Sequence, residues 1–393
     1  MTPRSPSRFA ISVLYVVMSL PLGGWLARIP EVRTAVSADD RSWGLANSVA
    51  GIGEFVGFLL ILVAVGKYST RGITILAATL ALLCAPLTAF TSTLQAVTVG
   101  LLVWAVANKV LGTTMGALAL VQQQKLGRPI IGMFEACYSF GMFAGGGLAY
   151  LATRFDISPG LQLTASNVVL AAAFLFSLRW LPDEARSSSA DLRLLPRLRA
   201  RAQPQLLLLA AIACLASVID SITSQWSAVY TSDSIGAGDS WGAATYTLMM
   251  VSKGIALLFV DRLLARFGWQ RIFRVSMLVS GAAFAVCLAV PSLTTALLSF
   301  AVLGVGMACV GPVINTLTTL QDNVTSGEGR TVLEFGELPG YIVAPLLTGV
   351  LAQWFGLGWA LVPVVLSLAA CYLVADKLER LPLAAKTTSR DFR

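Results

Sequence analysis

Long apolar stretches, separated by short polar or Gly/Pro-rich segments, make up most of this chain. A helix needs about 20 apolar residues to cross the hydrocarbon core of a bilayer. Twelve stretches of about that length can be delimited. They fall near residues 9–27, 43–65, 73–91, 94–121, 129–153, 160–179, 205–231, 240–260, 272–291, 295–320, 331–355 and 358–375. The pattern predicts an all-α integral membrane protein with twelve transmembrane helices.

The longest polar connection lies between the sixth and seventh stretches, at residues 180–204, and it is rich in arginine. We therefore expect two six-helix, pseudo-symmetric halves, residues 1–179 and 205–393, joined by a basic cytoplasmic linker. Such a linker is better explained as a tether between the halves whose basic residues fix the membrane topology than as a nucleic-acid contact, because its charges lie next to membrane spans.

The two halves repeat each other in sequence, in one of two registers. Counting seven residues from the Gly-Arg pair that opens the fifth and the eleventh stretch pairs Glu135 with Glu337. Aligning Gly141 with Gly340 instead pairs Glu135 with Glu334. Repeats of this kind place the binding site near the membrane midplane, between the halves.

Composition and charge agree with a membrane protein. The 393 residues are 56% hydrophobic and 12% charged, whereas soluble domains carry about 25% charged residues. Most Lys and Arg residues fall on the side of the membrane that holds both termini, which the positive-inside rule assigns to the cytoplasm. The exceptions are four arginines on the opposite side and two lysines within spans: Arg28, Arg33, Arg41, Arg154, Lys109 and Lys253.

Several classes of site are disfavoured by the residues present. The chain has no histidine, and its six cysteines all lie in apolar runs, so we expect no metal site, no cofactor and no disulfide framework. No phosphate-binding G-x-x-x-x-G-K-[ST] loop occurs, which argues against ATP-driven pumping. An intramembrane enzyme would need paired aspartates or Ser/His, and only Asp220 is a mid-span aspartate.

Seven ionisable side chains nevertheless lie inside the predicted spans. Inserting a charged side chain at the centre of a membrane-spanning helix costs about 2.5–3.5 kcal/mol of free energy on insertion scales. Such residues are retained where they face a watery, protein-lined interior. Four lie mid-membrane and three lie nearer the cytoplasm: Glu54, Lys109, Asp220 and Lys253, then Glu135, Glu334 and Glu337.

Helical spacing groups the mid-membrane charges with neighbouring polar residues. Asp220, Thr223, Ser227 and Tyr230 form one stripe, expected to line a central cavity, with Trp226 alongside. Two alternatives stay open for the lysines. Lys253 either contacts an anionic group or pairs with Asp220, and Lys109 either has a role of its own or neutralises Glu54.

The cytoplasmic-side carboxylates are candidates for proton binding. Glu334 and Glu337 share a helical face. Two neighbouring carboxylates repel when both are ionised, so one of them tends to hold a proton. Glu135 and Tyr138 form a similar face in the first half. For Glu334 and Glu337 the alternative is a cytoplasmic-side gate in which they pair with arginines of the loop between the eighth and ninth spans or between the tenth and eleventh.

A resemblance to a known family rests on two segments. The segment Asp261-Arg262-Leu263-Leu264-Ala265-Arg266-Phe267-Gly268-Trp269-Gln270-Arg271 is similar to the D-R-x-x-x-R-x-G-x-x-R loop of the major facilitator superfamily. Trp226-Ser227-Ala228-Val229-Tyr230, together with Arg28-Ile29-Pro30, resembles the bacterial YbjJ-like group, distantly fucose permease-like. Where that group tends to carry a histidine, this chain has Glu135.

The resemblance implies a secondary active transporter of the bacterial cytoplasmic membrane, with substrate and proton contacts among the buried charges and a gating loop at Asp261–Arg271. We expect a monomer that moves a small solute by alternating access and couples transport to protons. Import of a polar or weakly anionic solute is favoured over the alternative of drug or metabolite efflux. A non-transporting membrane receptor is a third reading.

Overall fold

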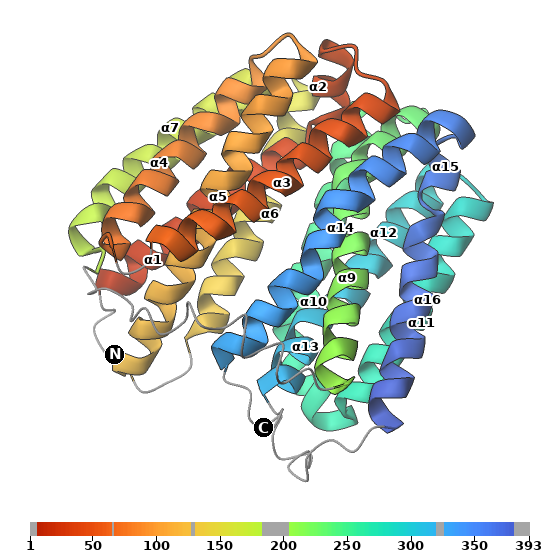
Figure 1. The fold of residues 1–393 in the computed structure, drawn as a ribbon. Coiled ribbons are helices and arrows are strands. Elements are labelled where there is room, and N and C mark those ends of the chain that lie inside the picture. Colours follow the sequence, from red (N-terminus) through yellow and green to blue (C-terminus); the bar gives the residue numbers. More distant parts are fainter. Residues whose placement is uncertain (1–5, 65–66, 127–129, 183–203, 320–325, 381–393) are drawn as a thin grey trace. The chain divides into compact units, whose positions relative to one another are not determined.

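The computed structural model of the chain describes residues 6–64, 67–126, 130–182, 204–319 and 326–380 (Figure 1). Every regular element among these residues is a helix. The predicted linker at 180–204 lies almost wholly outside the described residues. The chain divides into two compact units, which are described separately. The first comprises the described part of 1–189 with Gly238–Thr247, and the second the described part of 190–237 with 248–393.

The first unit is built from closely packed helix pairs. Helix α1 packs along α6, α3 packs along α5, and α4 contacts both α5 and α7 (Figure 1). Its elements are α1 (Pro6–Ala27), α2 (Ile29–Ala35), α3 (Asp40–Ala64), α4 (Thr70–Ala89), α5 (Leu94–Leu126), α6 (Ile131–Arg154), α7 (Pro159–Ser177) and the 3-10 turn η1 (Leu178–Trp180).

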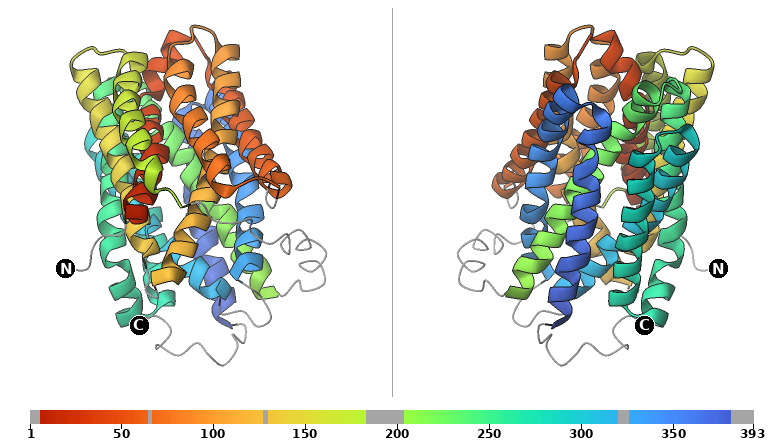
Figure 2. Two further views of the ribbon diagram at one scale, coloured as in Figure 1. Left: turned by 90° about the vertical axis from the view of Figure 1, so that its left-hand side faces the viewer. Right: turned by 90° about the vertical axis from the view of Figure 1, so that its right-hand side faces the viewer.

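The second unit repeats this arrangement. Helix α9 runs beside α14 and α16, and α11 contacts α12 and α16 (Figures 1 and 2). Its elements are α9 (Pro204–Val229), the π-helical turn η3 (Tyr230–Ser234), α10 (Asp239–Phe267), α11 (Trp269–Ala289), α12 (Leu293–Met307), α13 (Val310–Thr319), α14 (Ser326–Phe355), α15 (Leu357–Ala360) and α16 (Val362–Arg380). The first turns of α10, up to Thr247, group with the first unit.

The predicted all-α membrane fold is confirmed, with a qualification about the count of spans. Ten helical segments among the described residues are long and apolar enough to cross a membrane. Helices α6 and α10 occupy the positions of the predicted fifth and eighth spans and contain 24 and 29 residues, but they are not among the ten. Both contain ionisable residues within the predicted span, Glu135 in α6 and Lys253 in α10, so the total of twelve stays a prediction.

Two predicted segments differ in detail from the structure. The span predicted at 295–320 corresponds to one candidate membrane span, Leu293–Thr318, but its helix is interrupted after Met307 and a new helix begins at Val310. The loop expected at Asp261–Arg271 is mostly helical, because α10 continues to Phe267 and α11 begins at Trp269. Charged residues mark the edge of the apolar span, but they do not end a helix, since they can extend from its exposed surface into water.

The α10–α11 connection is therefore reduced to Gly268. Its φ is +79° and its ψ is 152°, a conformation that is essentially restricted to glycine. This single residue connects two long helices without a longer loop. Arg262, Arg266 and Arg271, expected in that loop, are exposed on the adjoining helical turns.

Replacing Gly268 with Ala is expected to lower the free energy of unfolding by about 1–3 kcal/mol, because a Cβ strains this backbone conformation. Thermal unfolding of the purified protein measures the effect. Gly311→Ala is the matched control in the same unit, since a Cβ there would meet no heavy atom within 4 Å. Equal melting temperatures for the two variants would contradict the strain argument.

One close helix contact recurs in both units. A Cβ added at Gly141 of α6 would lie 1.9 Å from Ser19 Oγ of α1, and one at Gly340 of α14 would lie 2.0 Å from Ser217 Oγ of α9. Each serine hydroxyl donates back to its own helix, at 2.8 Å. The matching contacts show that Gly141 and Gly340 are equivalent positions.

This equivalence selects one of the two repeat registers. Counting from the paired glycines, Glu135 corresponds to Glu334, and Tyr138 corresponds to Glu337. Glu337 therefore has no carboxylate counterpart in the first unit. The two halves have diverged at that position.

Candidate functional site

Asp220 and Lys253 form an ion pair between α9 and α10. The Nζ atom of Lys253 lies 3.1 Å from Oδ1 of Asp220 and donates a hydrogen bond to it. About a third of each side chain is exposed, 31% for Lys253 and 35% for Asp220. Pairing was one of the two alternatives for Lys253, and the geometry bears it out.

Both mid-span lysines lie at close contacts between helices. A Cβ at Gly304 of α12 would lie 2.3 Å from Met249 O and 3.2 Å from Lys253 N, so α12 can approach α10 only because residue 304 is a glycine. In the first unit, a Cβ at Gly57 of α3 would lie 2.9 Å from Lys109 Cβ of α5. Each lysine therefore lies at a contact that a glycine permits.

Glu54 precedes Gly57 by three residues and lies on the same side of α3. The α3–α5 contact thus places Glu54 and Lys109 on neighbouring turns of two packed helices. Both side chains are partly buried. The first unit therefore carries opposite charges on two packed helices, as the second does with Asp220 and Lys253.

The polar stripe predicted on α9 is divided in the structure. Tyr230 is 2% exposed, and its hydroxyl donates to Cys287 O of α11 at 3.4 Å. Its ring packs against Phe300 with centroids 6.5 Å apart. Thr223 donates to Ile219 O of its own helix at 2.7 Å. Tyr230 thus belongs to the packing of the second unit, and we do not retain it as a substrate contact.

Trp226 and Ser227 are fully buried near the end of α9. The indole N–H of Trp226 and the hydroxyl of Ser227 have no hydrogen-bond partner among the described residues. Buried polar atoms are almost always hydrogen-bonded in native proteins. Ser227 also lies seven residues from Asp220, on the same side of α9.

The three carboxylates nearer the cytoplasm are distributed over both units. Glu135 is exposed on α6, and Tyr138 is partly buried one turn later. Glu334 and Glu337 are partly buried on α14. Glu337 lies between Gly336 and Gly340, the two glycines that bring α14 against the α9 backbone. Of the arginines that the gate alternative invokes, Arg330 lies in the first turns of α14 and its side chain is outside the described residues.

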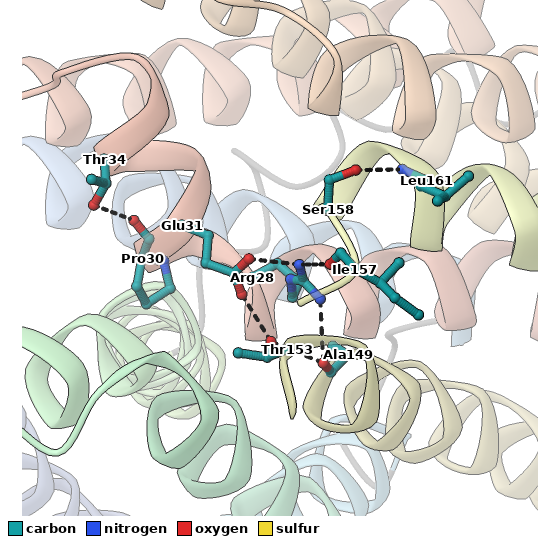
Figure 3. Close-up of polar contacts among 9 residues, drawn as sticks. All are labelled: Arg28, Pro30, Glu31, Thr34, Ala149, Thr153, Ile157, Ser158 and Leu161. Carbon is teal, nitrogen blue, oxygen red and sulfur yellow. Dashed lines mark hydrogen bonds and ion pairs between the residues drawn. The ribbon is translucent and has the colours of Figure 1, made fainter. Parts of the chain in front are cut away.

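A second polar cluster surrounds Arg28, at the junction of α1 and α2 (Figure 3). The guanidinium is fully buried. It donates to Oε2 of Glu31 at 2.6 Å, to Ile157 O at 2.5 Å and to Ala149 O at 3.4 Å. The other Glu31 oxygen, Oε1, accepts a hydrogen bond from the Thr153 hydroxyl at 2.8 Å. The cluster joins the end of α1 to α6 and to the α6–α7 turn.

Local sequence positions these groups. Pro30 is tolerated in the first turn of α2, where its missing N–H is not needed. The Thr34 hydroxyl donates to Pro30 O at 2.9 Å. Arg28 and Glu31 are three residues apart and therefore face the same side. At the start of α7, the Ser158 hydroxyl accepts from Leu161 N (Figure 3).

Burial dominates the ionisation of this pair. Burial raises the pKa of Glu31 and lowers the pKa of Arg28, and in each case their mutual attraction opposes the shift without reversing it. Both groups therefore move toward their neutral forms, which means that desolvation exceeds the gain from pairing. Exposed Asp39 behaves in the opposite way, because hydrogen bonds from Ser42 lower its pKa.

No group of three or more Cys, Asp or Glu side chains that could hold a metal ion occurs within the described ranges. The six cysteines are free thiols.

Comparisons with known proteins agree with this architecture. Membrane protein MosC of Rhizobium meliloti is 24% identical over 371 residues, which cover 91% of this chain and 86% of that protein. An uncharacterised MFS-type transporter of Yersinia pestis is 20% identical over 352 residues, covering 89% and 90%.

Solved structures show the same fold at lower sequence identity. The nucleoside transporter NupG matches with a TM-score of 0.74 and 15% identity, over 95% of this chain and 99% of that one. A bacterial homologue of the human lysosomal transporter Spinster matches with a TM-score of 0.69 and 13% identity, over 98% of both chains. Residues 7–326 match the sequence model of the Major Facilitator Superfamily. The chain therefore belongs to the Major Facilitator Superfamily and is a multi-pass membrane transporter, not an enzyme.

Proposed function

We propose that this transporter carries a small polar or weakly anionic solute into the cell across the bacterial cytoplasmic membrane, driven by protons. It works as a monomer with both termini in the cytoplasm. The halves 1–179 and 205–393, joined by the linker 180–204, move the solute by alternating access. The observation that carries the proposal is the Asp220–Lys253 ion pair.

This pair has the properties of a coupling site. Two charges inside apolar helices are costly to desolvate, and a partly exposed pair is accessible to a solute or a proton. A proton on Asp220 ends the ion pair and leaves the Lys253 ammonium free to attract an anionic group. The Trp226 N–H and the Ser227 hydroxyl, which have no hydrogen-bond partner among the described residues, supply further polar contacts in the last turn of α9.

The remaining carboxylates supply the proton path. Glu135 and Glu334 are counterparts in the repeat, so each half contributes one carboxylate at the equivalent position of its own fold. Glu337 adds a third in the second half. Glu54 and Lys109 give the first half its own opposite charges.

Identification of the solute comes first. Purified protein is screened for thermal stabilisation by sugars, nucleosides, organic acids and amphiphilic drugs at two pH values. Nucleosides are included because NupG is a nucleoside transporter. Stabilisation by a polar solute supports the proposal. Stabilisation by amphiphilic drugs alone, followed by their extrusion from liposomes, would favour efflux. A chain that binds solutes but moves none in either direction would be a receptor.

Neutralising a coupling carboxylate should separate exchange from accumulation. Glu135→Gln and Glu337→Gln are each expected to abolish solute accumulation driven by a pH gradient, because the proton-binding group is lost. Both variants should still exchange solute across the liposome membrane when the internal and external pH are equal. Radiolabelled solute in proteoliposomes measures both.

Asp39→Asn is the control, because this carboxylate is exposed outside the predicted spans and should tolerate the change. If gradient-driven accumulation survives in both glutamate variants, these residues do not couple protons. The Asp220 and Lys253 variants then decide whether coupling resides there.

A further inference from the structure

Arg28 and Glu31 lie outside the predicted spans and have no part in the function proposed above. The central feature of the Arg28 cluster is a fully buried guanidinium with three acceptors on other residues (Figure 3). Two are backbone carbonyls, of Ala149 and Ile157, whose charge cannot change. The third is the Glu31 carboxylate, whose charge can change.

The position of Glu31 makes its ionisation consequential. One oxygen contacts Arg28 and the other contacts Thr153 of α6, so a single carboxylate joins the α1–α2 junction to α6. Its side chain is 20% exposed, so water can reach it and deliver a proton. Arg28 in the same pair is completely enclosed.

We propose that Glu31 is a proton-binding site that sets how the α1–α2 junction is attached to α6 and to the α6–α7 turn. When Glu31 is ionised, the Arg28–Glu31–Thr153 chain holds the junction in place. When Glu31 accepts a proton from water, its ion pair with Arg28 ends. The buried guanidinium then keeps only two neutral carbonyls, and the junction rearranges to rehydrate or re-pair it.

The charged groups that act on Glu31 come from two segments. Arg28 precedes it on the same segment and favours the ionised form. Asp239, in the part of α10 that packs with the first unit, favours the protonated form. Thr153 of α6 is neutral and favours the ionised carboxylate through its hydrogen bond. Together with burial, these contributions raise the pKa of Glu31.

The environment of the cluster contains a spectroscopic probe. Trp25 lies three residues before Arg28, is 2% exposed, and packs edge-on against Trp104 with ring centroids 5.8 Å apart. A rearrangement of the junction should change its emission. Subtracting the fluorescence of a Trp25→Phe variant from that of the wild type isolates this signal from the other tryptophans.

The full chain in detergent micelles is titrated between about pH 4 and about pH 9, without any solute. The wild type should show a Trp25 fluorescence step with a midpoint above the value of about 4.3 for free glutamate. Glu31→Gln should abolish the step, because the amide cannot titrate yet keeps an oxygen for Thr153. Asp39→Asn, a change at an exposed carboxylate, should leave the step in place.

Two further variants should shift the midpoint in opposite directions. Asp239→Asn should lower it, because a nearby negative charge is removed. Thr153→Val should raise it, because the ionised carboxylate loses a hydrogen bond. No step in the wild type, or a step that persists in Glu31→Gln, would overturn the proposal. If Glu31→Gln does not fold, the proposal is overturned when the midpoints of Asp239→Asn and Thr153→Val fail to move in opposite directions. Since no solute is present, this result is independent of the transport assays.

Discussion

Replacing Lys253 with Gln is expected to abolish concentrative transport and to lower the free energy of unfolding by about 1–3 kcal/mol, the usual penalty for leaving a buried polar partner unsatisfied. The variant leaves the Asp220 carboxylate inside the second unit without its ammonium partner at 3.1 Å. About a third of each side chain is exposed, so solvent reduces the penalty and the lower part of that range applies. Thermal unfolding and liposome uptake measure the two effects.

The double variant Asp220→Asn with Lys253→Gln separates structure from function. Removing both charges eliminates the unpaired group, so stability should return to near the wild-type value. Transport should stay lost, because neither a proton acceptor nor an ammonium group is left. Wild-type uptake by the double variant would show that the pair has only a structural role.

Replacing Gly145 with Ala is expected to destabilise the first unit strongly. A Cβ there would lie 2.1 Å from Leu20 O and 2.7 Å from Gly24 N, which are backbone atoms of α1 and cannot rotate away. Overpacking usually costs about 1–3 kcal/mol, and we expect the upper end here. The melting temperature of the purified protein reports the loss.

Gly147 offers a matched control two residues later in the same helix. A Cβ at Gly147 would meet no heavy atom within 4 Å, so Gly147→Ala should gain about 0.5–1 kcal/mol from helix propensity alone. The two Gly→Ala changes should therefore move the melting temperature in opposite directions. Similar shifts would mean that α1 and α6 are less closely packed than described.

The equivalent contacts in the two units allow a finer comparison. At Gly141 the severe clash is with the Ser19 hydroxyl alone, whereas at Gly340 two backbone atoms of α9 also lie within 2.7 Å of the added Cβ. Ser19→Gly should therefore restore more of the stability lost in Gly141→Ala than Ser217→Gly restores in Gly340→Ala.

The mid-span charges were identifiable from sequence because an ionisable residue in an apolar run is costly and conspicuous. Pairing with Asp220 was one of two alternatives that the sequence left open for Lys253. Spacing describes only one helix at a time, however, so it placed Tyr230 with Asp220 on a cavity-lining stripe. The hydroxyl of Tyr230 instead donates to α11, and only the neighbouring helices could reveal that.

The Arg28 cluster had little signal in the sequence. Two of its acceptors are backbone carbonyls, which every residue possesses, so their use leaves no mark on residue type. The i, i+3 spacing of Arg28 and Glu31 was the one available hint, and it resembles an ordinary surface pair. The sequence could not decide the register of the repeat either. An alignment on the Gly-Arg pairs and an alignment on Gly141 and Gly340 fit equally well until the helix contacts distinguished them.

Apolar length and rare charges were sufficient to predict a helical membrane transporter, because the bilayer requires every spanning segment to be apolar and to satisfy its own backbone hydrogen bonds. These are properties of single segments, and a sequence displays them directly. The partners of Lys253, the enclosure of Arg28 and the equivalence of Gly141 with Gly340 depend on which helices touch and how closely. Such contacts arise only when the helices pack, since distances between segments far apart in the chain are set by tertiary structure.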